Sequence, residues 1–250
     1  MLSMRKRGVK VEWNEYNDTS MTAHKGRPPY RLAYCTRQEA ERAEALPPEI
    51  RARFSAEELS QLKSLPPRRL RDRLAGRLAA KRALAEHFAE EEGWIAEPRE
   101  LEIFNDDAGR PFLRLPPGAM AAAPSFSITH CAEGGAAAVG GAGRRVGVDL
   151  ETVVARPAEV IAFVSAPIEN RSAGPDSPEA QARLWTAKEA ALKLLGLGLG
   201  ADARAVRPEA EDVTFTGLPA EIWRELGSPR VRLAYEQVQG AMLAVVFTGD

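Results

Sequence analysis

One pattern occurs twice along the chain, and it constrains the fold more than any other feature. Leucines at near-helical spacing predict a long helix from 68 to 91, and a second helix is predicted from a Ser177 cap to about 195. Pro178 occupies the first position of the second helix, where proline is favoured, and Gly196 ends it. Short apolar segments flank both helices. We therefore expect two halves, each with one long helix and several strands.

The two helices also share a weak sequence similarity. Residues 77–84 resemble parts of 183–192, and in that alignment Arg82 occupies the place of Glu189. Alanine-rich helices produce such matches by chance, so the similarity alone does not establish a repeat. It predicts that only the second helix carries the acidic group.

Alternating apolar residues and turn residues predict the remaining elements. Two hairpins are expected, one joining 101–104 to 112–115 and one joining 136–139 to 146–150 through the glycine-rich segment 140–143. Short helices are expected at 38–45 and after Ser55, whose hydroxyl would form a capping box with Glu58. The stretch from 152 to 175 is expected to be loop. Further strands are expected at 31–35, 125–131, 212–215, 231–235 and 241–247.

Composition limits the kind of protein this can be. The chain has 250 residues, 44% of them hydrophobic, which suits one large domain or two smaller ones with a proper core. We expect a polar N-terminal extension at 1–30 that is partly disordered, an N-terminal half at 31–140 and a C-terminal half at 141–250. The formal net charge of −1 argues against a nucleic-acid partner, which usually requires a basic excess.

Cysteine usage and hydropathy suggest a cytoplasmic protein. Cys35 and Cys131 are the only two cysteines, so no disulfide framework is implied and a reducing compartment suits the chain. We find no signal-peptide pattern and no apolar run long enough for a membrane span. A structural zinc site is not expected, because the three histidines are far apart and no CxxC pair is present.

A short strand that carries two carboxylates is the main indication of function. In the segment 146–151, Asp149 and Glu151 share one face of the strand, while Val146, Val148 and Leu150 point to the other. Two carboxylates on one face repel each other unless a cation or protons lie between them. They could also simply face solvent.

Glu189 follows about forty residues later on the second helix and favours a cation site over two carboxylates that simply face solvent. Trp185, Glu189 and Lys193 are spaced four apart and share a helix face. With Lys188 and Lys193 beside it, Glu189 completes a candidate site for Mg²⁺ and phosphate, since Mg²⁺ prefers oxygen ligands and often binds substrate phosphates. The alternatives are an ordinary surface pair between Glu189 and Lys193 and a solvated Lys188.

Basic residues elsewhere allow two interpretations each. Arginine or lysine recurs every four residues at 69, 73, 77 and 81, which makes a stripe that is either a solvated helix face or a binding surface. His130 ends a strand and is either structural or a phosphate donor. Arg110 lies between a glycine and a proline, as a turn residue would.

Four blocks in this order resemble the 4′-phosphopantetheinyl transferases of the surfactin-synthetase-activating type. They cover 74–81, 109–111, 126–130, and 146–151 together with 185–193. The last block is the most specific, because Gly-x-Asp-x-Glu, a gap of about forty residues and Trp-x-x-Lys-Glu-x-x-x-Lys rarely occur together by chance. The resemblance extends from about residue 35 to the end of the chain.

The resemblance implies an α+β fold of two similar halves related by a pseudo-twofold axis, each a small antiparallel sheet packed on a long helix. It implies that CoA binds in the cleft between them. The phosphopantetheine arm of CoA would move to a serine of an apo acyl or peptidyl carrier protein, leaving adenosine 3′,5′-bisphosphate. A monomer would suffice, because one chain completes the cleft.

The resemblance also implies roles for individual residues. Asp149, Glu151 and Glu189 match the ligands of Mg²⁺, for which Mn²⁺ is an alternative. Glu189 and Lys193 would take part in catalysis, with Lys193 at the diphosphate. The residues that would contact CoA are Arg68, Arg110, Thr129, His130, Lys188 and Lys193.

Two departures from the family pattern concern CoA binding. The family often has Asn-x-Ser-His where this chain has 127–130 as Ser-Ile-Thr-His. Its basic cluster before the first long helix has no clear counterpart here. Two rival hypotheses are a non-catalytic CoA- or carrier-binding module of the same fold and an unrelated Mg²⁺-dependent phosphohydrolase, for which no nucleophile motif is found.

Overall fold

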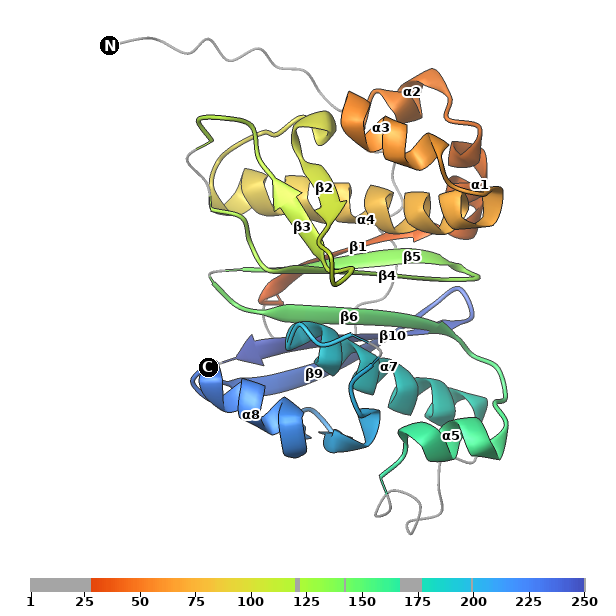
Figure 1. Cartoon of the computed structure of the whole chain (residues 1–250), viewed down its shortest axis with the longest axis vertical. Helices are drawn as coiled ribbons and strands as arrows, with labels where there is room; N and C mark the ends of the chain where they lie inside the picture. The colour runs from red at the N-terminus through yellow and green to blue at the C-terminus, as the bar shows by residue number, and fades with distance from the viewer. Residues whose placement is uncertain (1–27, 120–121, 142, 167–176, 199, 250) are drawn as a thin grey trace.

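A computed structural model describes residues 28–119, 122–141, 143–166, 177–198 and 200–249. The predicted extension at 1–30 lies almost wholly outside these residues. The fold is a repeat of one α+β unit, and Figure 1 shows the two copies stacked on each other. The predicted fold class is therefore confirmed.

We call the elements from β1 to β5 the first half and those from β6 to β10 the second half. The first half contains β1 (Tyr30–Thr36), α1 (Arg37–Glu44), α2 (Pro48–Arg51), α3 (Ala56–Lys63), α4 (Pro67–Glu91), the 3₁₀ turn η1 (Pro98–Glu100), β2 (Glu102–Asn105), β3 (Pro111–Arg114), β4 (Phe126–Cys131) and β5 (Gly134–Gly140). The second contains β6 (Val146–Thr152), α5 (Ala158–Val164), α7 (Pro178–Leu194), η2 (Ala203–Ala205), β7 (Val206–Pro208), β8 (Val213–Phe215), α8 (Gly217–Glu225), β9 (Arg230–Val238) and β10 (Ala241–Gly249).

The halves have the same topology. Each has a three-stranded antiparallel sheet, with strand order β1-β5-β4 in the first and β6-β10-β9 in the second. In both sheets the last strand in sequence lies in the middle. Each half also inserts a two-stranded hairpin, β2-β3 or β7-β8, after its long helix. The weak similarity between the helices therefore coincides with a structural repeat.

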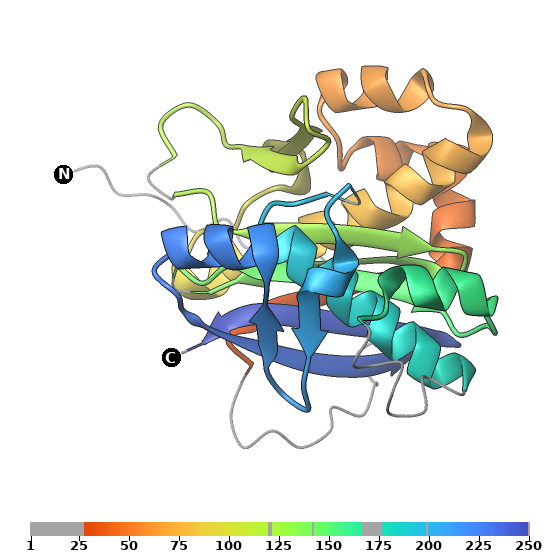
Figure 2. The same ribbon diagram turned by 60° about the horizontal axis from the view of Figure 1, so that its bottom comes forward.

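The two sheets pack face to face, and the long helices cover the outer faces (Figures 1 and 2). One apolar cluster lies between the sheets and includes Val146, Val148 and Leu150 of β6. Two others lie beneath α4 and beneath α7. The face predicted to be buried on β6 is thus confirmed, and the carboxylates of that strand face α7. None of the described helices is long and apolar enough to cross a membrane.

Three hydroxyls join the halves where an edge of each sheet meets the other. Ser125, Ser127 and Thr129, on and just before β4, accept hydrogen bonds from successive outward N–H groups of β6. The donors are the backbone nitrogens of Val146, Val148 and Leu150, at 3.2, 3.1 and 3.2 Å. An edge strand would otherwise leave these donors unpaired. We call these three contacts the hydroxyl ladder.

Helix α7 approaches β6 closely because Gly147 has no side chain. A Cβ at that position would lie 1.9 Å from the carbonyl oxygen of Ala190, which no real structure tolerates. The start of α7 is as predicted, since Ser177 Oγ accepts from the Ala180 N–H and Pro178 follows the cap. The glycine therefore sets the distance between the carboxylates of β6 and the residues of α7.

Several local predictions were correct and others were wrong. The capping box of Ser55 and Glu58 is present at α3, and β2 and β3 form the expected hairpin. The hairpin expected across 140–143 is wrong, because β5 pairs with β1 and β4 whereas β6 pairs with β10. That segment connects the two sheets. The stretch from 152 to 175, expected to be loop, contains α5, and its part from 167 onward lies outside the described residues. The sequence pattern also did not predict α2, α8 and β7.

Candidate active site

Strand β6 and helix α7 bring two acidic side chains together in a nearly buried position. Asp149 is 5% exposed and Glu189 is 8% exposed. Glu151 lies two residues further along the same strand face and is half-buried. The expectation that these three carboxylates share one region of the fold agrees with this placement.

Asp149 has one satisfied and one unsatisfied oxygen. Its Oδ1 accepts hydrogen bonds from Lys193 Nζ at 2.7 Å and from Thr129 Oγ1 at 3.0 Å. Its Oδ2 is buried and has no hydrogen-bond partner among the described residues. Buried carboxylate oxygens usually have a partner, so this oxygen is a candidate ligand for a cation.

The three carboxylates also affect one another's pKa values. Burial, followed by the charge of Asp149, raises the pKa of Glu189 to about 7, with Lys193 opposing the shift and Glu151 adding to it. Burial and the charge of Asp149 also raise the pKa of Glu151, against the effect of Arg156. The cluster therefore holds more negative charge than the surrounding cations balance.

Lys193 bonds to the strand rather than to its helical neighbour. Its Nζ donates to Asp149 Oδ1 and, at 3.1 Å, to the carbonyl oxygen of Val148. The alternative of an ordinary surface pair between Glu189 and Lys193 is thus not what the structure shows. An ammonium has three donors, and the third is available to a ligand on the side where Lys193 remains 29% exposed.

Arg156 is a further member of the cluster that sequence analysis missed. Its Nη2 lies 2.7 Å from Glu151 Oε2, and its guanidinium stacks over Trp185 at 5.5 Å from the ring centre. The backbone N–H of Arg156 donates to Gln181 of α7 at 2.8 Å. The only signal in the sequence was a basic residue shortly after a carboxylate strand, which is too common to be informative.

The donor set suits a hard divalent cation, although no cage is preformed. Among the described residues, no group of three acidic, histidine or cysteine side chains is arranged to hold a metal ion. Mg²⁺ commonly takes only one or two protein carboxylates and completes its shell with water and substrate phosphate. Carboxylate oxygens, one of them buried without a partner, fit that habit.

A cavity of about 220 Å³ lies in the first half. It lies between α4, the β2-β3 hairpin and the end of β4, and His130 lines it. Desolvation lowers the pKa of His130, and the charge of Asp72, which also lines the cavity, opposes the shift; Lys193 and Asp149 have smaller effects of opposite sign. His130 therefore lines the cavity and also lies within electrostatic reach of the acidic cluster.

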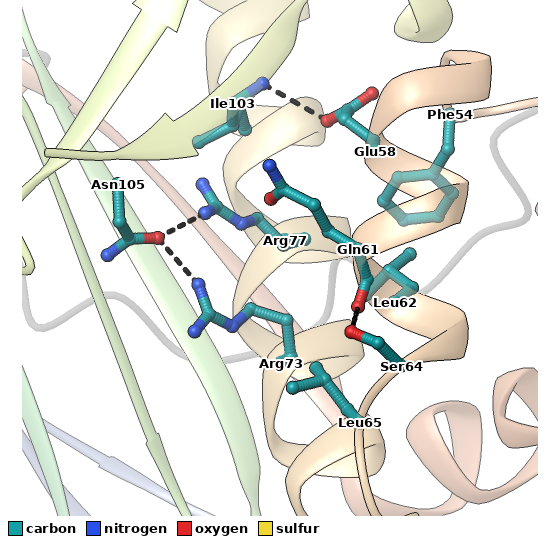
Figure 3. A pocket seen from close by; sticks show the side chains of 10 residues that line it. All are labelled: Phe54, Glu58, Gln61, Leu62, Ser64, Leu65, Arg73, Arg77, Ile103 and Asn105. Atoms are coloured by element: carbon teal, nitrogen blue, oxygen red, sulfur yellow. Dashed lines mark hydrogen bonds between the residues drawn. The ribbon is translucent and has the colours of Figure 1, made fainter.

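Two arginines face this cavity together with Asp72, and neither donates a hydrogen bond to a carboxylate of the described residues. Arg73 and Arg77, one turn apart on α4, both donate to Asn105 Oδ1 at 2.5 Å (Figure 3). Arg77 is 5% exposed, and its Nη1 has no partner among the described residues. Burial, followed by the charge of Arg73, lowers the pKa of Arg77 to about 9. A second cavity of about 220 Å³ lies beyond the pair, against Phe54 and α3.

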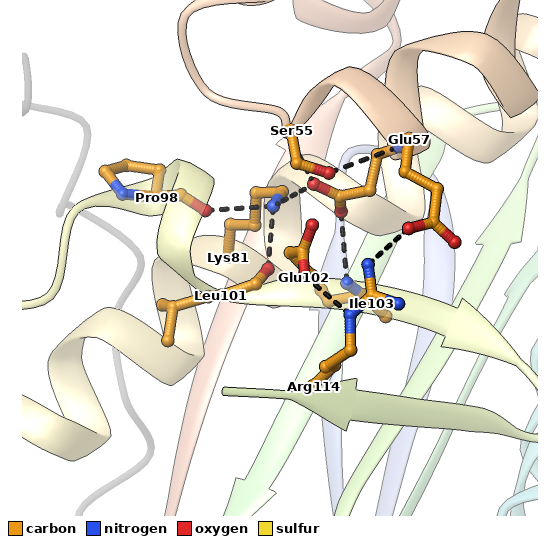
Figure 4. A network of polar contacts seen from close by, with 9 residues as sticks. Ser55, Glu57, Lys81, Pro98, Leu101, Glu102, Ile103 and Arg114 are labelled. Carbon is orange, nitrogen blue, oxygen red and sulfur yellow. Dashed lines mark hydrogen bonds and ion pairs between the residues drawn. The ribbon is translucent and has the colours of Figure 1, made fainter. Parts of the chain in front are cut away.

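The basic stripe is therefore not a solvated face over its whole length. Arg69 and Arg73 are exposed, but Arg77 and Lys81 are buried beneath α3 and the β2-β3 hairpin. Spacing on α4 correctly placed them on one face, yet the sequence does not reveal what covers that face. Lys81 is 1% exposed and pairs with Glu58 Oε2 at 3.0 Å. Its Nζ also donates to the carbonyl oxygens of Pro98 and Leu101 (Figure 4).

Lys188 is not placed to contact a ligand in this site, contrary to expectation. It is fully buried, and its Nζ donates to the carbonyl oxygens of Ala203 and Val206 at 3.2 and 2.6 Å. Lys81 makes the equivalent contacts in the first half, to the carbonyl oxygens of Pro98 and Leu101. Both lysines hold the 3₁₀ turn that precedes a hairpin. A side chain committed to these internal acceptors cannot reach a phosphate.

The remaining predicted residues lie at different distances from the cluster. Arg110 is exposed in the β2-β3 turn and pairs with Asp106. It reaches the turn just after α7, where its Nη1 would be 3.4 Å from a Cβ on Gly196. Arg68 is exposed in the first turn of α4. Thr129 is 4% exposed and lies against Asp149.

Comparison with solved structures finds proteins about half the size of this chain. The holo-ACP-synthase of Plasmodium yoelii is 18% identical, with a TM-score of 0.34, and the match covers 42% of this chain and 92% of that one. For the holo-[acyl-carrier-protein] synthase (AcpS) of Neisseria meningitidis the identity is 20%, the TM-score 0.34, and the coverage 42% and 98%. Likeness at this level specifies neither fold nor function for the present chain.

One segment of the sequence is similar to a known superfamily. No curated protein matches the chain. A family model does match residues 145–224, the segment that contains β6, α7 and all three carboxylates. This segment is similar to the 4′-phosphopantetheinyl transferase superfamily.

Proposed function

We propose that this protein transfers the 4′-phosphopantetheine arm of CoA to a serine of an apo acyl or peptidyl carrier protein, releasing adenosine 3′,5′-bisphosphate. The observation that carries the proposal is the buried cluster of Asp149, Glu189 and Lys193 within the segment similar to that superfamily. An unpartnered carboxylate oxygen and a free ammonium donor lie side by side in it, which suits a cation and a phosphate together.

The first half would bind the nucleotide end of CoA. Arg73 and Arg77 present two guanidiniums around a single neutral acceptor, and guanidiniums pair strongly with phosphate. His130 adds a ring nitrogen at the opening of the same cavity. Arg110, carried on an exposed turn, can close over the ligand from the side of α7.

The second half would hold the diphosphate. Asp149 and Glu189, with Glu151 beside them, would bind the divalent cation, Mg²⁺ or Mn²⁺, which supplies charge neutralisation for the diphosphate. Lys193 contributes a fixed positive charge next to the same phosphates, where charge develops on the leaving group. Arg156 holds Glu151 in place through its ion pair.

In the proposed transfer, one bond to phosphorus forms, one breaks, and a side chain of this protein takes the proton. The serine Oγ forms a bond to the phosphorus that carries the pantetheine arm, and the bond from that phosphorus to the bridging oxygen breaks. The electron pair of that bond leaves with adenosine 3′,5′-bisphosphate, next to Lys193. The serine proton passes to Glu189, directly or through a water molecule.

A mass measurement tests the proposal. The chain is incubated with CoA, Mg²⁺ and an apo carrier protein, and the carrier is then weighed. A gain of one phosphopantetheine is expected with the wild type and none with Asp149→Ala or Glu189→Ala. An unchanged carrier together with measurable CoA binding would favour a binding module, and CoA breakdown without a carrier would favour a phosphohydrolase.

A further inference from the structure

Thr129 differs from the other members of the hydroxyl ladder in touching a carboxylate. Ser125 and Ser127 each accept one backbone N–H of β6. Thr129 Oγ1 does the same with the Leu150 N–H at 3.2 Å, and it also lies 3.0 Å from Asp149 Oδ1. The third rung of the ladder is therefore in direct contact with the acidic cluster.

The chemistry of a hydroxyl decides which group donates in this contact. A threonine hydroxyl has one hydrogen and two lone pairs, and the Leu150 N–H occupies a lone pair. The carboxylate of Asp149 can only accept, so the hydroxyl hydrogen goes to Asp149 Oδ1. At 4% exposure, Thr129 then has no donor left for a substrate phosphate.

We infer that Thr129 is a positioning residue for Asp149 and does not contact CoA. This inference rests on the proposed function and replaces the CoA contact that the family resemblance implied for this residue. Thr129 and Lys193 together hold Oδ1, from opposite halves of the molecule, and this leaves Oδ2 as the oxygen directed to a cation. The junction between the halves thereby sets the orientation of the carboxylate.

Three variants of the full chain test the inference. Thr129→Val keeps the shape and removes the hydroxyl, while Thr129→Ser keeps the hydroxyl. Ser127→Ala is the matched control, because it removes one rung of the same ladder without touching a carboxylate. For each variant, the thermal midpoint, the Mn²⁺ affinity by EPR, the crystal structure and the kinetics with varied CoA are measured.

The expected pattern separates positioning from contact and from mere stability. Thr129→Val and Ser127→Ala should lower the thermal midpoint by similar amounts. Only Thr129→Val should weaken Mn²⁺ binding, by about tenfold, as is typical when an outer-shell partner of a metal ligand is lost. It should lower kcat to a similar extent and leave the KM for CoA within about twofold. Thr129→Ser should restore both.

Each contrary outcome overturns the inference in a recognisable way. A raised KM for CoA with normal kcat in Thr129→Val would show a substrate contact. If Ser127→Ala loses as much Mn²⁺ affinity as Thr129→Val does, the hydroxyl of Thr129 has only a structural role. An Asp149 carboxylate that keeps its orientation in the Thr129→Val crystal structure would exclude positioning, whether or not the wild type is active. If the carboxylate does rotate in Thr129→Val but the wild type shows no transfer activity, the result counts against the proposed function and not against positioning.

Discussion

Two buried side chains carry opposite charges that the fold leaves poorly compensated. The pKa of Glu189 is raised to about 7 and that of Arg77 is lowered to about 9, and burial is the main cause of both shifts. A guanidinium resists losing its proton, so burying Arg77 without an anion is energetically unfavourable. A ligand that brings a cation to Glu189 and a phosphate to Arg77 would relieve both at once. Metal-bound CoA has that distribution of charge.

Glu189 should make the stability of the metal-free protein depend on pH. Its pKa is higher in the folded state than the ordinary 4.5, so its contribution to stability is complete below about pH 4.5 and is lost as the pH rises through 7. Glu189→Gln cannot ionise. Without metal, it should be more stable than the wild type above pH 7, by up to roughly 3 kcal/mol, with no difference near pH 4.

Urea unfolding of both proteins across this pH range, in chelator, measures the difference. Glu225→Gln on the exposed side of α8 is the control and should follow the wild type. Added Mg²⁺ should reduce the advantage of Glu189→Gln by stabilising the wild type. A difference that does not change with pH would contradict the assigned pKa.

At the scale of elements, a close approach between helix and sheet recurs in both halves. Helix α7 lies against Gly147 of β6, and α4 lies against Gly135 of β5, where a Cβ would be 2.5 Å from the backbone of Ala75. In each case the helix can come near only because the strand has no side chain there. These contacts position the functional side chains of α7 and α4 relative to their sheets.

Gly147→Ala should displace α7 from β6. We expect a loss of about 1–3 kcal/mol of unfolding free energy from overpacking, because the atoms in the way are backbone and cannot rotate aside. Transfer activity should fall further than stability does, since Glu189 moves away from Asp149. Gly198→Ala, where no atom lies within 4 Å of the added carbon, is the control for urea unfolding and activity. Equal effects of the two substitutions would disprove this account.

The two equivalent lysines should contribute to stability rather than to CoA binding. Lys81→Met leaves the buried Glu58 carboxylate without its cation and should cost about 3–5 kcal/mol. Lys188→Met leaves two carbonyl groups without a donor and should cost about 1–3 kcal/mol. Denaturant unfolding gives both values. A large rise in the KM for CoA in Lys188→Met, with unchanged stability, would restore the phosphate contact that the structure does not support.

At the scale of the whole molecule, the two copies of the repeated unit carry different side chains, and the proposed site draws on both. The first half presents arginines and a histidine, and the second presents carboxylates and a lysine. Where the second half has Glu189, the first has Arg82, which pairs with Glu39 at 2.6 Å and donates to the carbonyl oxygen of Tyr34. The first half therefore has an arginine, Arg82, at the position where the second half has the carboxylate of Glu189.

This division predicts separable kinetic effects. Arg77→Gln in the first half should raise the KM for CoA at least tenfold and change kcat little, since it removes a binding contact remote from the bond that breaks. Asp149→Asn in the second half should reduce kcat by a factor of 100 or more (about 3 kcal/mol of transition-state stabilisation). Steady-state kinetics with varied CoA measures both, with Arg99→Gln as an exposed control. If Arg77→Gln lowers kcat and leaves the KM for CoA unchanged, binding and catalysis are not separated between the two halves.

The sequence by itself determined what depends on neighbours along the chain. Alternation placed Asp149 and Glu151 on one face of β6, a capping serine and a proline located the start of α7, and four-residue spacing grouped Glu189 with Lys193. Such patterns are local, because strand and helix periods decide which side chains share a face.

Only the tertiary structure decided which faces meet. It separated β5 from β6 into different sheets, buried Lys188 against η2, and brought Arg77 to Asn105 and Arg156 to Glu151. Except for the pair of Arg156 and Glu151, which are five residues apart in the sequence, these contacts join separate elements of the fold. The contacts between separate elements depend on the strand order and on how closely each helix packs on its sheet. The spacing of residues along one element determines neither.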